Sequence, residues 1–486
     1  MVRIFGNYIN GKEVRSNSGK SFESINPTSE KILGKFQLSN SKDVQLAVMS
    51  AKKGKEKWSK IPAPYRGQVL LEIANLLRKR KNQLAKLESM EMGKILSEAK
   101  GDVQEAIDIF EYMSGEGRRL FGHTTPSELP NKSCYTLRKP LGVVGLITPW
   151  NFPIAIPSWK VAPALICGNG IVLKPSSETP FCALEFVKLC EEAGVPKGVI
   201  NLVTGSGQEV GGNLIRSNEI DGISFTGSKK TGEFIAKNAG LKKVGLELGG
   251  KNPIIIMDDA DLDLAMEGVL FGSFGTTGQR CTAASRLILH KKISKEFENM
   301  LVSRTKKLRV GDPLKESTNI GPLVNKKAVE KTEKYSQIAR KEGAKVLCGG
   351  IKSGKGFFYN PTVFTNVKSS TRVAQEEIFG PAVSLITVKN FEEAIEVANC
   401  IEYGLSSSIY TNNVNLAHKA IDLLEAGIVY VNSPTIGAEV HLPFGGIKGT
   451  GNGTREAGIE GIHEFSETQT VYIDYSGKLQ KAQRIK

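Results

Sequence analysis

The stretch Gly142-Val143-Val144-Gly145-Leu146-Ile147-Thr148 is an unbroken apolar run that leads into Pro149-Trp150-Asn151-Phe152-Pro153. A short apolar run without polar alternation predicts a strand that is buried on both faces, as in a parallel sheet. The two prolines predict a rigid turn directly after this strand. The turn presents the amide side chain of Asn151.

Strand-like and helix-like segments alternate on the carboxyl side of this stretch, up to about residue 250. The predicted strands are Ile171 to Lys174, Val199 to Thr204, Gly222 to Thr226 and Val244 to Leu248, and a helix is predicted over Ala183 to Ala193. This βαβ alternation predicts an α/β fold with a parallel sheet.

A second series of the same kind begins with the strand-like run Pro253 to Met257 and continues to about residue 440. Asp259 or Asp261 can cap the helix that follows, Leu262 to Phe274, because short acidic side chains accept hydrogen bonds from the first helical N–H groups. The sequence therefore predicts two α/β domains.

Two segments fit neither series. Ser133 to Arg138 and Glu467 to Tyr475 alternate between polar and apolar residues and are rich in strand formers. Alternation of this kind predicts edge strands.

The length and composition of the chain limit the class of protein to which it can belong. A chain of 486 residues with 40% apolar residues is expected to build more than one core. We find no secretory leader and no apolar run of about 18 residues that could span a bilayer, so a cytoplasmic location and no membrane partner are expected. The seven cysteines form no Cys-x-x-Cys pair and the five histidines are scattered, which indicates a reducing compartment and no metal site.

The chain is basic, with 65 Lys and Arg against 50 Asp and Glu, a net charge of +15. The basic residues are dispersed, and the one concentrated stretch, 478–486, lacks the interleaved aromatic residues of a nucleic-acid platform. We therefore interpret the charge as a solvated surface and expect no nucleic-acid partner.

One cysteine lies in a setting typical of a nucleophile, the segment Phe274-Gly275-Thr276-Thr277-Gly278-Gln279-Arg280-Cys281-Thr282. A neighbouring cation such as Arg280 lowers the pKa of a thiol, so the segment predicts a reactive Cys281 thiolate. Glu247 leaves a predicted strand into Gly249 and Gly250, where a carboxylate can face a cleft. A nucleophile, a carboxylate and an amide donor are thus all present.

These segments, in this order, resemble the aldehyde dehydrogenase superfamily over nearly the whole chain, and more narrowly its NADP-preferring branch of semialdehyde and glyceraldehyde dehydrogenases. The blocks that carry the resemblance are Pro149 to Pro153, Lys174 to Pro180, Phe225 to Ser228, Glu247 to Gly250, Gly278 to Thr282, Glu376 to Pro381 and Pro443 to Gly446.

The resemblance implies a domain organisation. Residues 1–120 and 141–248 would form a Rossmann-like dinucleotide-binding domain, and residues 249–465 a catalytic domain that carries Cys281. Residues 121–140 and 466–486 would form a small β oligomerisation segment, which implies a homodimer or homotetramer.

The resemblance also implies a mechanism. Cys281 would attack an aldehyde, with the Asn151 side chain and the Cys281 backbone N–H donating to the oxyanion. Hydride transfer to the nicotinamide would leave a thioester, which water activated by Glu247 would hydrolyse to a free acid. Lys160 resembles the family lysine of the proton relay, although a solvated surface lysine is the alternative.

A dinucleotide site is implied by the same resemblance. The implied contacts are Thr148, Pro149, Trp150, Lys174, Ser177, Gly207, Phe225, Gly227, Ser228, Leu248, Glu377 and Phe379. The glycines Gly205, Gly207 and Gly211 are one residue off the usual fingerprint. Ser177 stands where NAD-preferring relatives commonly have Glu, and a hydroxyl leaves room for a 2′-phosphate, so NADP is expected with NAD as the alternative. A shift of the turn by one residue would put Glu178 there instead.

The implied substrate contacts are Phe152, Trp159, Arg280, Thr282 and Phe444. A buried guanidinium needs an anionic partner, so Arg280 favours an aldehyde with an acidic tail. We expect 2,5-dioxopentanoate, with glyceraldehyde or its phosphate, succinate semialdehyde and aminoadipate semialdehyde as alternatives. An internal ion pair between Arg280 and a Glu or Asp would remove this argument.

Two other classes compete with this interpretation. The run Gly349 to Lys355 reproduces the spacing of a phosphate-binding P-loop, but Gly356 stands where Ser or Thr would ligate magnesium. The chain could also be a non-catalytic binding protein on the same fold, against which the intact Asn151, Glu247 and Cys281 argue.

Overall fold

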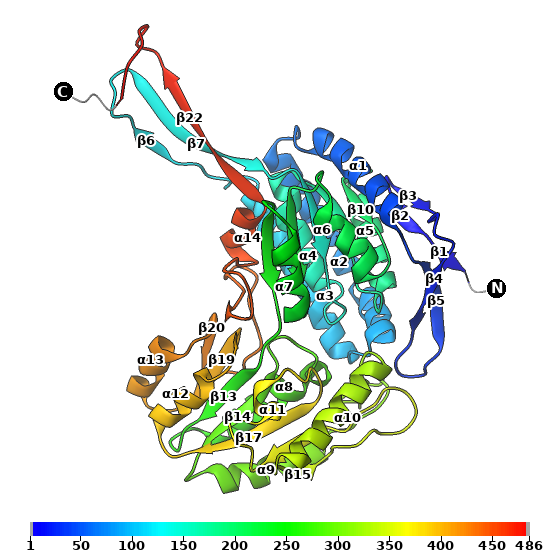
Figure 1. Cartoon of the computed structure of the whole chain (residues 1–486), viewed down its shortest axis with the longest axis vertical. Helices are drawn as coiled ribbons and strands as arrows, with labels where there is room; N and C mark the ends of the chain where they lie inside the picture. Colours follow the sequence, from blue (N-terminus) through cyan, green and yellow to red (C-terminus); the bar gives the residue numbers. More distant parts are fainter. Residues whose placement is uncertain (1–2, 483–486) are drawn as a thin grey trace.

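The structure is a computed structural model that describes residues 3–482. Two α/β lobes lie one above the other in Figure 1, and a long β arm projects from the upper lobe. The predicted segments 1–120 and 466–486 extend beyond the described residues at the two termini, as does the end of the basic stretch 478–486.

The first lobe contains a seven-stranded sheet in the order β12-β11-β8-β9-β10-β2-β3. Its strands are β2 (Asn7–Ile9), β3 (Lys12–Val14), β8 (Val143–Ile147), β9 (Gly170–Lys174), β10 (Ile200–Leu202), β11 (Gly222–Thr226) and β12 (Lys243–Glu247). The five strands β8 to β12 are parallel, and every residue of β8 and β9 is buried. The strands predicted between residues 142 and 250 are therefore confirmed, with ends that differ by one or two residues.

Helices cover this sheet and supply most of the first core. They are α1 (Ser41–Trp58), α2 (Ala63–Met92), α3 (Leu96–Glu116), α4 (Ala155–Cys167), α5 (Pro180–Glu192), α6 (Gly212–Arg216) and α7 (Lys229–Asn238), with a π-turn at Gly207–Gly211. The predicted helix Ala183 to Ala193 begins earlier, at Pro180, because proline suits the first helical position. A small sheet of β1 (Ile4–Phe5), β4 (Ser21–Ile25) and β5 (Ile32–Gln37) lies at the amino-terminal edge.

The second lobe is built on another seven-stranded sheet, in the order β15-β16-β17-β14-β13-β19-β20, with only β15 antiparallel. Its strands are β13 (Asn252–Ile256), β14 (Ala284–His290), β15 (Lys345–Cys348), β16 (Thr362–Thr365), β17 (Ala382–Val388), β19 (Ser406–Tyr410) and β20 (Ile428–Val431). Its helices are α8 (Leu262–Phe274), α9 (Ser294–Lys306), α10 (Lys326–Lys341), α11 (Arg372–Gln375), α12 (Phe391–Asn399) and α13 (Val414–Leu423). Of the two predicted caps of α8, Asp261 is the one used, because Asp259 instead accepts from the Thr411 hydroxyl.

The arm is a three-stranded antiparallel sheet of β6 (Thr124–Pro126), β7 (Lys132–Pro140) and β22 (Ser466–Asp474). The two segments predicted as edge strands, at residues 133–138 and 467–475, pair with each other in it. The prediction is correct for β22, but β7 is the central strand, because β6 pairs along its other side. Figure 1 shows the arm standing clear of both lobes. Leu137, Tyr472 and Ile473 are exposed on it.

The chain crosses back to the first lobe after β20. A two-stranded ladder of β18 (Tyr403–Gly404) and β21 (Ile447–Lys448) precedes the short helix α14 (Gly458–Glu464). Ile462 and Phe465 belong to the same buried core as Leu165, and the Cys167 thiol donates to the Ile462 carbonyl oxygen. Residues near 444–465 therefore stand beside α4 and the end of β12.

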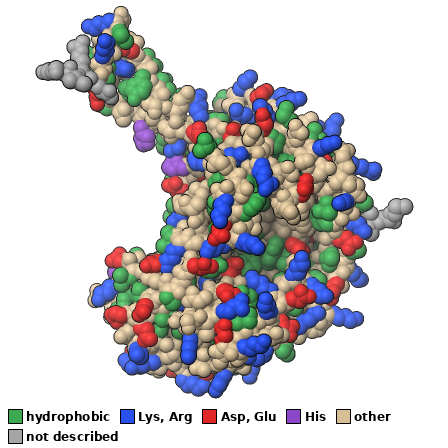
Figure 2. All heavy atoms as spheres, viewed as in Figure 1, with side chains coloured by type: hydrophobic (Ala, Val, Ile, Leu, Met, Phe, Trp, Pro, Cys, Tyr) green, Lys and Arg blue, Asp and Glu red, His purple; other side chains and the backbone are tan. Residues whose placement is uncertain are grey.

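Three further observations concern membrane-spanning helices, cysteines and surface side chains. No helix between residues 3 and 482 is long and apolar enough to cross a membrane. All seven cysteines are free thiols. In Figure 2 the Lys and Arg side chains are scattered over the visible face, and apolar side chains are visible in the hollow between the lobes.

Candidate active site

Two cavities meet at Cys281, where the two lobes face each other. The larger has a volume of about 220 Å³ and the smaller about 70 Å³. Thr226, Leu248 and Cys281 line both. The Cys281 side chain is therefore accessible from two sides, as a group that acts between two bound molecules must be.

The loop that carries Cys281 is held from several directions. The Asn252 amide donates to the Cys281 carbonyl oxygen at 2.7 Å and to the Ala283 carbonyl oxygen at 3.0 Å. A Cβ on Gly250 would lie 2.5 Å from the Cys281 carbonyl oxygen, so only glycine fits this close approach. Thr276 and Thr277 adopt left-handed backbone angles, with φ of 51° and 57°, a strain that is common at functional sites.

The expectation that Arg280 lowers the pKa of Cys281 is wrong. Burial and the nearby carboxyl groups of Glu247 and Glu377 raise the pKa of Cys281 to about 12. The Arg280 side chain is instead hydrogen-bonded within its own loop, where its Nε donates to the Thr276 hydroxyl at 2.9 Å. The thiol is therefore neutral at pH 7 in this state and needs a base when it reacts.

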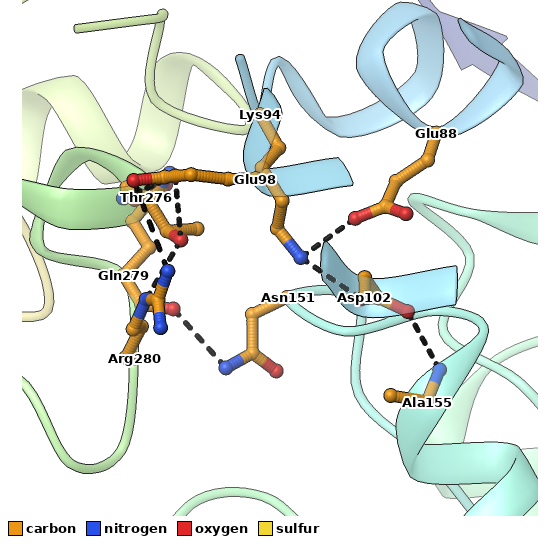
Figure 3. Close-up of polar contacts among 9 residues, drawn as sticks. All are labelled: Glu88, Lys94, Glu98, Asp102, Asn151, Ala155, Thr276, Gln279 and Arg280. Carbon is orange, nitrogen blue, oxygen red and sulfur yellow. Dashed lines mark hydrogen bonds and ion pairs between the residues drawn. The ribbon is translucent and has the colours of Figure 1, made fainter. Parts of the chain in front are cut away.

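Asn151 stands at the carboxyl end of β8, as predicted, and lines the larger cavity. Its side-chain nitrogen donates to the Gln279 carbonyl oxygen at 3.1 Å, which Figure 3 shows. An amide nitrogen carries two N–H groups, so the second is free to donate to a ligand oxygen. The Gln279 contact fixes the amide beside the loop that carries Cys281.

Glu247 is the last residue of β12, lies buried on the wall of the smaller cavity, and has no hydrogen-bond partner on either carboxyl oxygen within residues 3–482. Burial and the Glu456 carboxylate raise its pKa well above the usual range, against the opposite effect of Lys160. Such a group holds a proton readily, which suits a general base.

Lys160 lies on α4 and is fully buried, so the alternative of a solvated lysine is excluded. It forms an ion pair with Glu456 and donates to the Ser224 hydroxyl at 2.8 Å. A buried ammonium that is paired and hydrogen-bonded has a defined position, and its charge acts on the Glu247 carboxyl group.

The larger cavity opens at the carboxyl ends of β8, β11 and β12, the usual place for a dinucleotide in an open parallel sheet. Of the twelve predicted cofactor contacts, those that line it are Pro149, Trp150, Gly227, Ser228, Leu248, Glu377 and Phe379. Ser228 stands immediately before α7, whose first N–H groups have no side-chain cap and can receive a phosphate. These features fit a dinucleotide.

Other residues of this cavity add detail. The rings of Trp150 and Phe379 meet edge to face with centroids 5.5 Å apart, and Phe379 has a φ of 60°. Burial raises the pKa of Glu377, which accepts from the Gly250 N–H at 3.1 Å. Lys331 of α10 also lines the cavity and stabilises the charge of Glu377. The sequence analysis did not identify Lys331, because a lysine within a helix has no distinctive local pattern.

The five remaining predicted cofactor contacts do not line the larger cavity; they are Thr148, Lys174, Ser177, Gly207 and Phe225. Burial lowers the pKa of Lys174 to about 8, and its ammonium donates to the Pro175 carbonyl oxygen at 2.7 Å. Glu178 accepts from the Asn325 amide at 2.8 Å, in the other lobe, so this carboxylate is already engaged.

All five predicted substrate contacts line the smaller cavity; they are Phe152, Trp159, Arg280, Thr282 and Phe444. The rings of Trp159 and Phe444 meet edge to face at 5.4 Å. Glu105 of α3, which the sequence did not single out, also lines this cavity, and burial raises its pKa to about 7. Besides Arg280 and Glu105, the charged residues of this cavity are Glu247 and Glu456, and most of its other lining residues are apolar.

Arg280 has an internal partner, but a loose one. Its terminal nitrogen lies 3.8 Å from a Glu98 carboxyl oxygen, and its guanidinium stands over the ring of Phe152 at 5.3 Å. Its two terminal nitrogens make no hydrogen bond within residues 3–482. Arg280 therefore keeps donors that a carboxylate in the cavity can use.

A buried ion cluster supports the turn after β8. The Lys94 ammonium lies 2.6 Å from Glu88 and 2.9 Å from Asp102, and 3.7 Å from the centre of the Phe152 ring. Asp102 also accepts from the Ala155 N–H, at the start of α4, at 2.7 Å (Figure 3). The position of Phe152 and Asn151 thus depends on α2 and α3.

Two further parts of the sequence analysis concern a metal site and the P-loop-like run. Within residues 3–482 no three His, Cys, Asp or Glu side chains are grouped as they would be to hold a metal ion. The run Gly349 to Lys355 follows β15 as a loop and does not lead into a helix, which a P-loop requires.

Cys281 thus lies between two cavities where two α/β lobes face each other, with a buried carboxyl group and an amide donor around it. The sequence pattern described as the aldehyde dehydrogenase family matches residues 14–471. The chain belongs to the aldehyde dehydrogenase family.

Individual relatives are similar over nearly their full lengths. The chain is 42% identical to alpha-ketoglutaric semialdehyde dehydrogenase of Bacillus subtilis, over 96% of this chain and 97% of that protein. It is 40% identical to 2,5-dioxopentanoate dehydrogenase of Saccharolobus solfataricus, over 94% and 96%. The crystal structure of betaine aldehyde dehydrogenase from Staphylococcus aureus in complex with NAD+ superimposes with a TM-score of 0.95 at 35% identity, over 98% and 96% of the two chains.

Proposed function

We propose that this protein is an NADP-dependent aldehyde dehydrogenase that oxidises 2,5-dioxopentanoate to the corresponding dicarboxylic acid through a thioester on Cys281. The observation that carries the proposal is the position of Cys281 between the two cavities, with Glu247 on the wall of the smaller and Asn151 on the wall of the larger.

In the first half-reaction the Cys281 thiol gives its proton to a water molecule, its sulfur bonds to the aldehyde carbon, and the carbonyl oxygen becomes an oxyanion. The second N–H of Asn151 and the backbone N–H of Cys281 donate to that oxygen. A nicotinamide dinucleotide in the larger cavity, held by residues such as Ser228 and Glu377, would supply the acceptor for the hydride of the aldehyde carbon. The acyl group then stays on Cys281 as a thioester.

In the second half-reaction Glu247 removes a proton from water, and the hydroxide adds to the thioester carbon. The carbon–sulfur bond breaks, the acid leaves, and Cys281 is regenerated. Burial and the Glu456 carboxylate raise the pKa of Glu247, which makes its ionised form a stronger base than an exposed carboxylate.

The preference for NADP rests on Ser177 and on the position of Glu178. The Ser177 hydroxyl is partly exposed and makes only a long contact, 3.4 Å, to the Gly205 carbonyl oxygen. The Glu178 carboxylate accepts from the Asn325 amide of the other lobe, so that contact, rather than a cofactor ribose, holds it. NAD is the alternative, and the solved relative in complex with NAD+ favours it.

The substrate proposal rests on Arg280 and on the relatives. The two relatives named for this semialdehyde cover nearly the whole chain. Arg280 is the one cation among the residues that line this cavity, and its donors suit an aldehyde with a carboxylate at its far end. Succinate semialdehyde and aminoadipate semialdehyde share that feature, and glyceraldehyde is the uncharged alternative.

The arm supports self-association into a homodimer or homotetramer. Tyr472 and Ile473 on β22 are exposed, and the sheet has unpaired edges. Apolar side chains on a projecting sheet are typical of a surface that another copy covers.

The test is the formation of reduced cofactor by the purified protein over neutral, hydroxylated, carboxylated and phosphorylated aldehydes, each with NAD and NADP. We expect the largest kcat/KM with 2,5-dioxopentanoate and NADP. A preference for neutral aldehydes would contradict the role of Arg280. Cofactor binding without turnover of any aldehyde would favour the non-catalytic binding protein.

A further inference from the structure

A further cavity, here called the arm-base cavity, lies where β7 and β22 leave the first lobe (Figure 1). Its volume is about 350 Å³, larger than that of either cavity at Cys281. Its walls come from the end of α1, the start of α2, the end of α4 and the two arm strands. Its lining residues differ from those of both cavities at Cys281, so it is a separate site.

The charged residues that line the arm-base cavity are all cations. They are Lys55, Arg66, Arg138 and Lys139. Within residues 3–482 none of the four forms an ion pair. This holds even for Lys139, although Glu467 stands opposite it in the strand register. A cleft lined by one sign of charge attracts ions of the opposite sign.

Arg66 is the buried member of this group, with 6% of its residue exposed. Its Nε and one terminal nitrogen donate to the Ile166 carbonyl oxygen at 3.0 and 2.8 Å, and the other terminal nitrogen donates to the Ile61 carbonyl oxygen. These bonds fix the guanidinium at the end of α4. A guanidinium has five N–H groups, so two remain to donate to a ligand.

The charge of Arg66 is not balanced by an anion of the protein. Burial lowers the pKa of Arg66, and among the described residues only the Cys167 thiol opposes this effect. Cys167 also lines the cavity, and burial raises its pKa to about 12 against the opposite effect of Arg66 and Arg138. The thiol is therefore neutral at pH 7 and supplies no counter-charge. A buried cation without a counter-ion is unfavourable, so a bound anion would stabilise this region.

The lining groups suit a phosphate group. Several cations around one cavity match a ligand group with more than one negative charge, and a phosphate monoester carries about −1.5 to −2 at pH 7. Guanidinium groups such as Arg66 and Arg138 match the spacing of phosphate oxygens. The Ser59 hydroxyl also lines the cavity and can donate to a phosphate oxygen. The volume leaves room for the organic part of a small molecule.

We propose that the arm-base cavity binds a small phosphorylated anion, held by Arg66 and Arg138 and attracted by Lys55 and Lys139. The ligand would connect α1, α2 and α4 of the first lobe to the strands of the arm. The inference is independent of the proposed function, because it involves neither cavity at Cys281.

The test titrates the purified protein with inorganic pyrophosphate by calorimetry, in buffer without divalent cations. Saturating NAD is present, so that pyrophosphate does not enter the larger cavity at Cys281. We expect saturable binding, with a Kd that rises between about 0.05 M and 0.5 M salt, because salt screens the attraction between charges. Pyrophosphate should also raise the Tm, since a ligand that binds only the folded chain stabilises it.

Variants locate the bound pyrophosphate. Arg138→Gln removes a half-buried guanidinium and should raise the Kd by at least about tenfold, the cost of one charged hydrogen bond. Lys55→Gln should change the Kd in the same direction. Arg66 is left unchanged because it also holds the end of α4. Lys86→Gln removes an exposed cation from α2 and is the matched control, which should keep the wild-type Kd.

Three results would overturn the inference. The first is wild-type protein that binds no pyrophosphate, as expected if a second copy of the chain covers the cavity. The second is an equal Kd in wild type, Arg138→Gln and Lys55→Gln, which would place the pyrophosphate elsewhere. The third is glutarate that binds as tightly as pyrophosphate, which would assign the cavity to dicarboxylates. None of these measurements needs turnover of an aldehyde, so failure of the proposed function would be distinguishable from failure of this inference.

Discussion

The side-chain nitrogen of Asn151 lies 3.1 Å from the carbonyl oxygen of Gln279, two residues before Cys281 in the chain. This contact joins the turn after β8 in the first lobe to the loop of the second lobe that carries Cys281. It leaves one N–H of the amide free, directed by the fixed plane of the group.

Asn151→Ala should therefore lower kcat of aldehyde oxidation by roughly 100- to 1000-fold, the usual cost of losing one oxyanion donor. The measurement is steady-state kinetics with the best aldehyde of the substrate panel. Asn213→Ala, at an exposed amide on α6, is the control and should keep wild-type activity. A loss of less than about fivefold in Asn151→Ala would show that this amide does not stabilise the oxyanion.

The neutral state of Cys281 predicts slow alkylation of the free enzyme. Because burial, Glu247 and Glu377 raise its pKa to about 12, its thiolate fraction, and hence its rate with iodoacetamide, should keep rising from pH 7 to above pH 9. Peptide mass spectrometry follows Cys281, with the exposed Cys400 as the internal control for the reagent. Glu247→Gln should speed the reaction at a given pH, since it removes a carboxyl group that opposes ionisation. A rate that levels off below pH 8 would contradict this account of the thiol.

Ser177→Glu should shift cofactor preference toward NAD by placing a carboxylate where a 2′-phosphate is proposed to bind. The measurement is the ratio of kcat/KM for NADP and NAD, and a decrease of at least about tenfold is expected, as for the repulsion of two close anions. Ser303→Glu, which adds a carboxylate at an exposed position of α9 in the other lobe, is the control. An unchanged ratio would refute the assigned 2′-phosphate pocket.

Arg280→Ala should reduce kcat/KM for 2,5-dioxopentanoate by roughly 10- to 100-fold more than for propanal, because a charged hydrogen bond to the substrate carboxylate is lost. Arg304→Ala removes an exposed guanidinium from α9 and serves as the control. Equal losses for both aldehydes would assign Arg280 to a structural role with Glu98 and Phe152.

Much of the sheet framework could be predicted from the sequence. The strands from Gly142 to Leu248 are short, apolar and separated by helix-like segments. Their hydrophobic pattern and their length were therefore sufficient to predict them as strands. The amino-terminal strands β1 to β5 and the helices α1 to α3 were not predicted individually. β2, for example, has three residues, and its place beside β10 depends on tertiary pairing that no local pattern reports.

The candidate site also contains residues that the sequence identified and residues that it did not. Cys281, Glu247 and Asn151 stand in distinctive local sequences at the ends of elements, and the structure brings them around one pair of cavities. Asn252 and Glu105 act through contacts with residues distant in the chain, and their surroundings have no local signature. The wrong prediction about the pKa of Cys281 has the same origin. Arg280 is next to Cys281 in the sequence, but its side chain contacts Thr276 and Glu98.

The most direct test of the central claim is intact-protein and peptide mass spectrometry of Glu247→Gln after mixing with aldehyde and cofactor. Without its base the variant should form about one reduced cofactor per subunit and then stop, with the acyl group on Cys281. Steady turnover without an adduct, or an adduct on any other cysteine, would contradict a thioester on Cys281 that is hydrolysed with the help of Glu247.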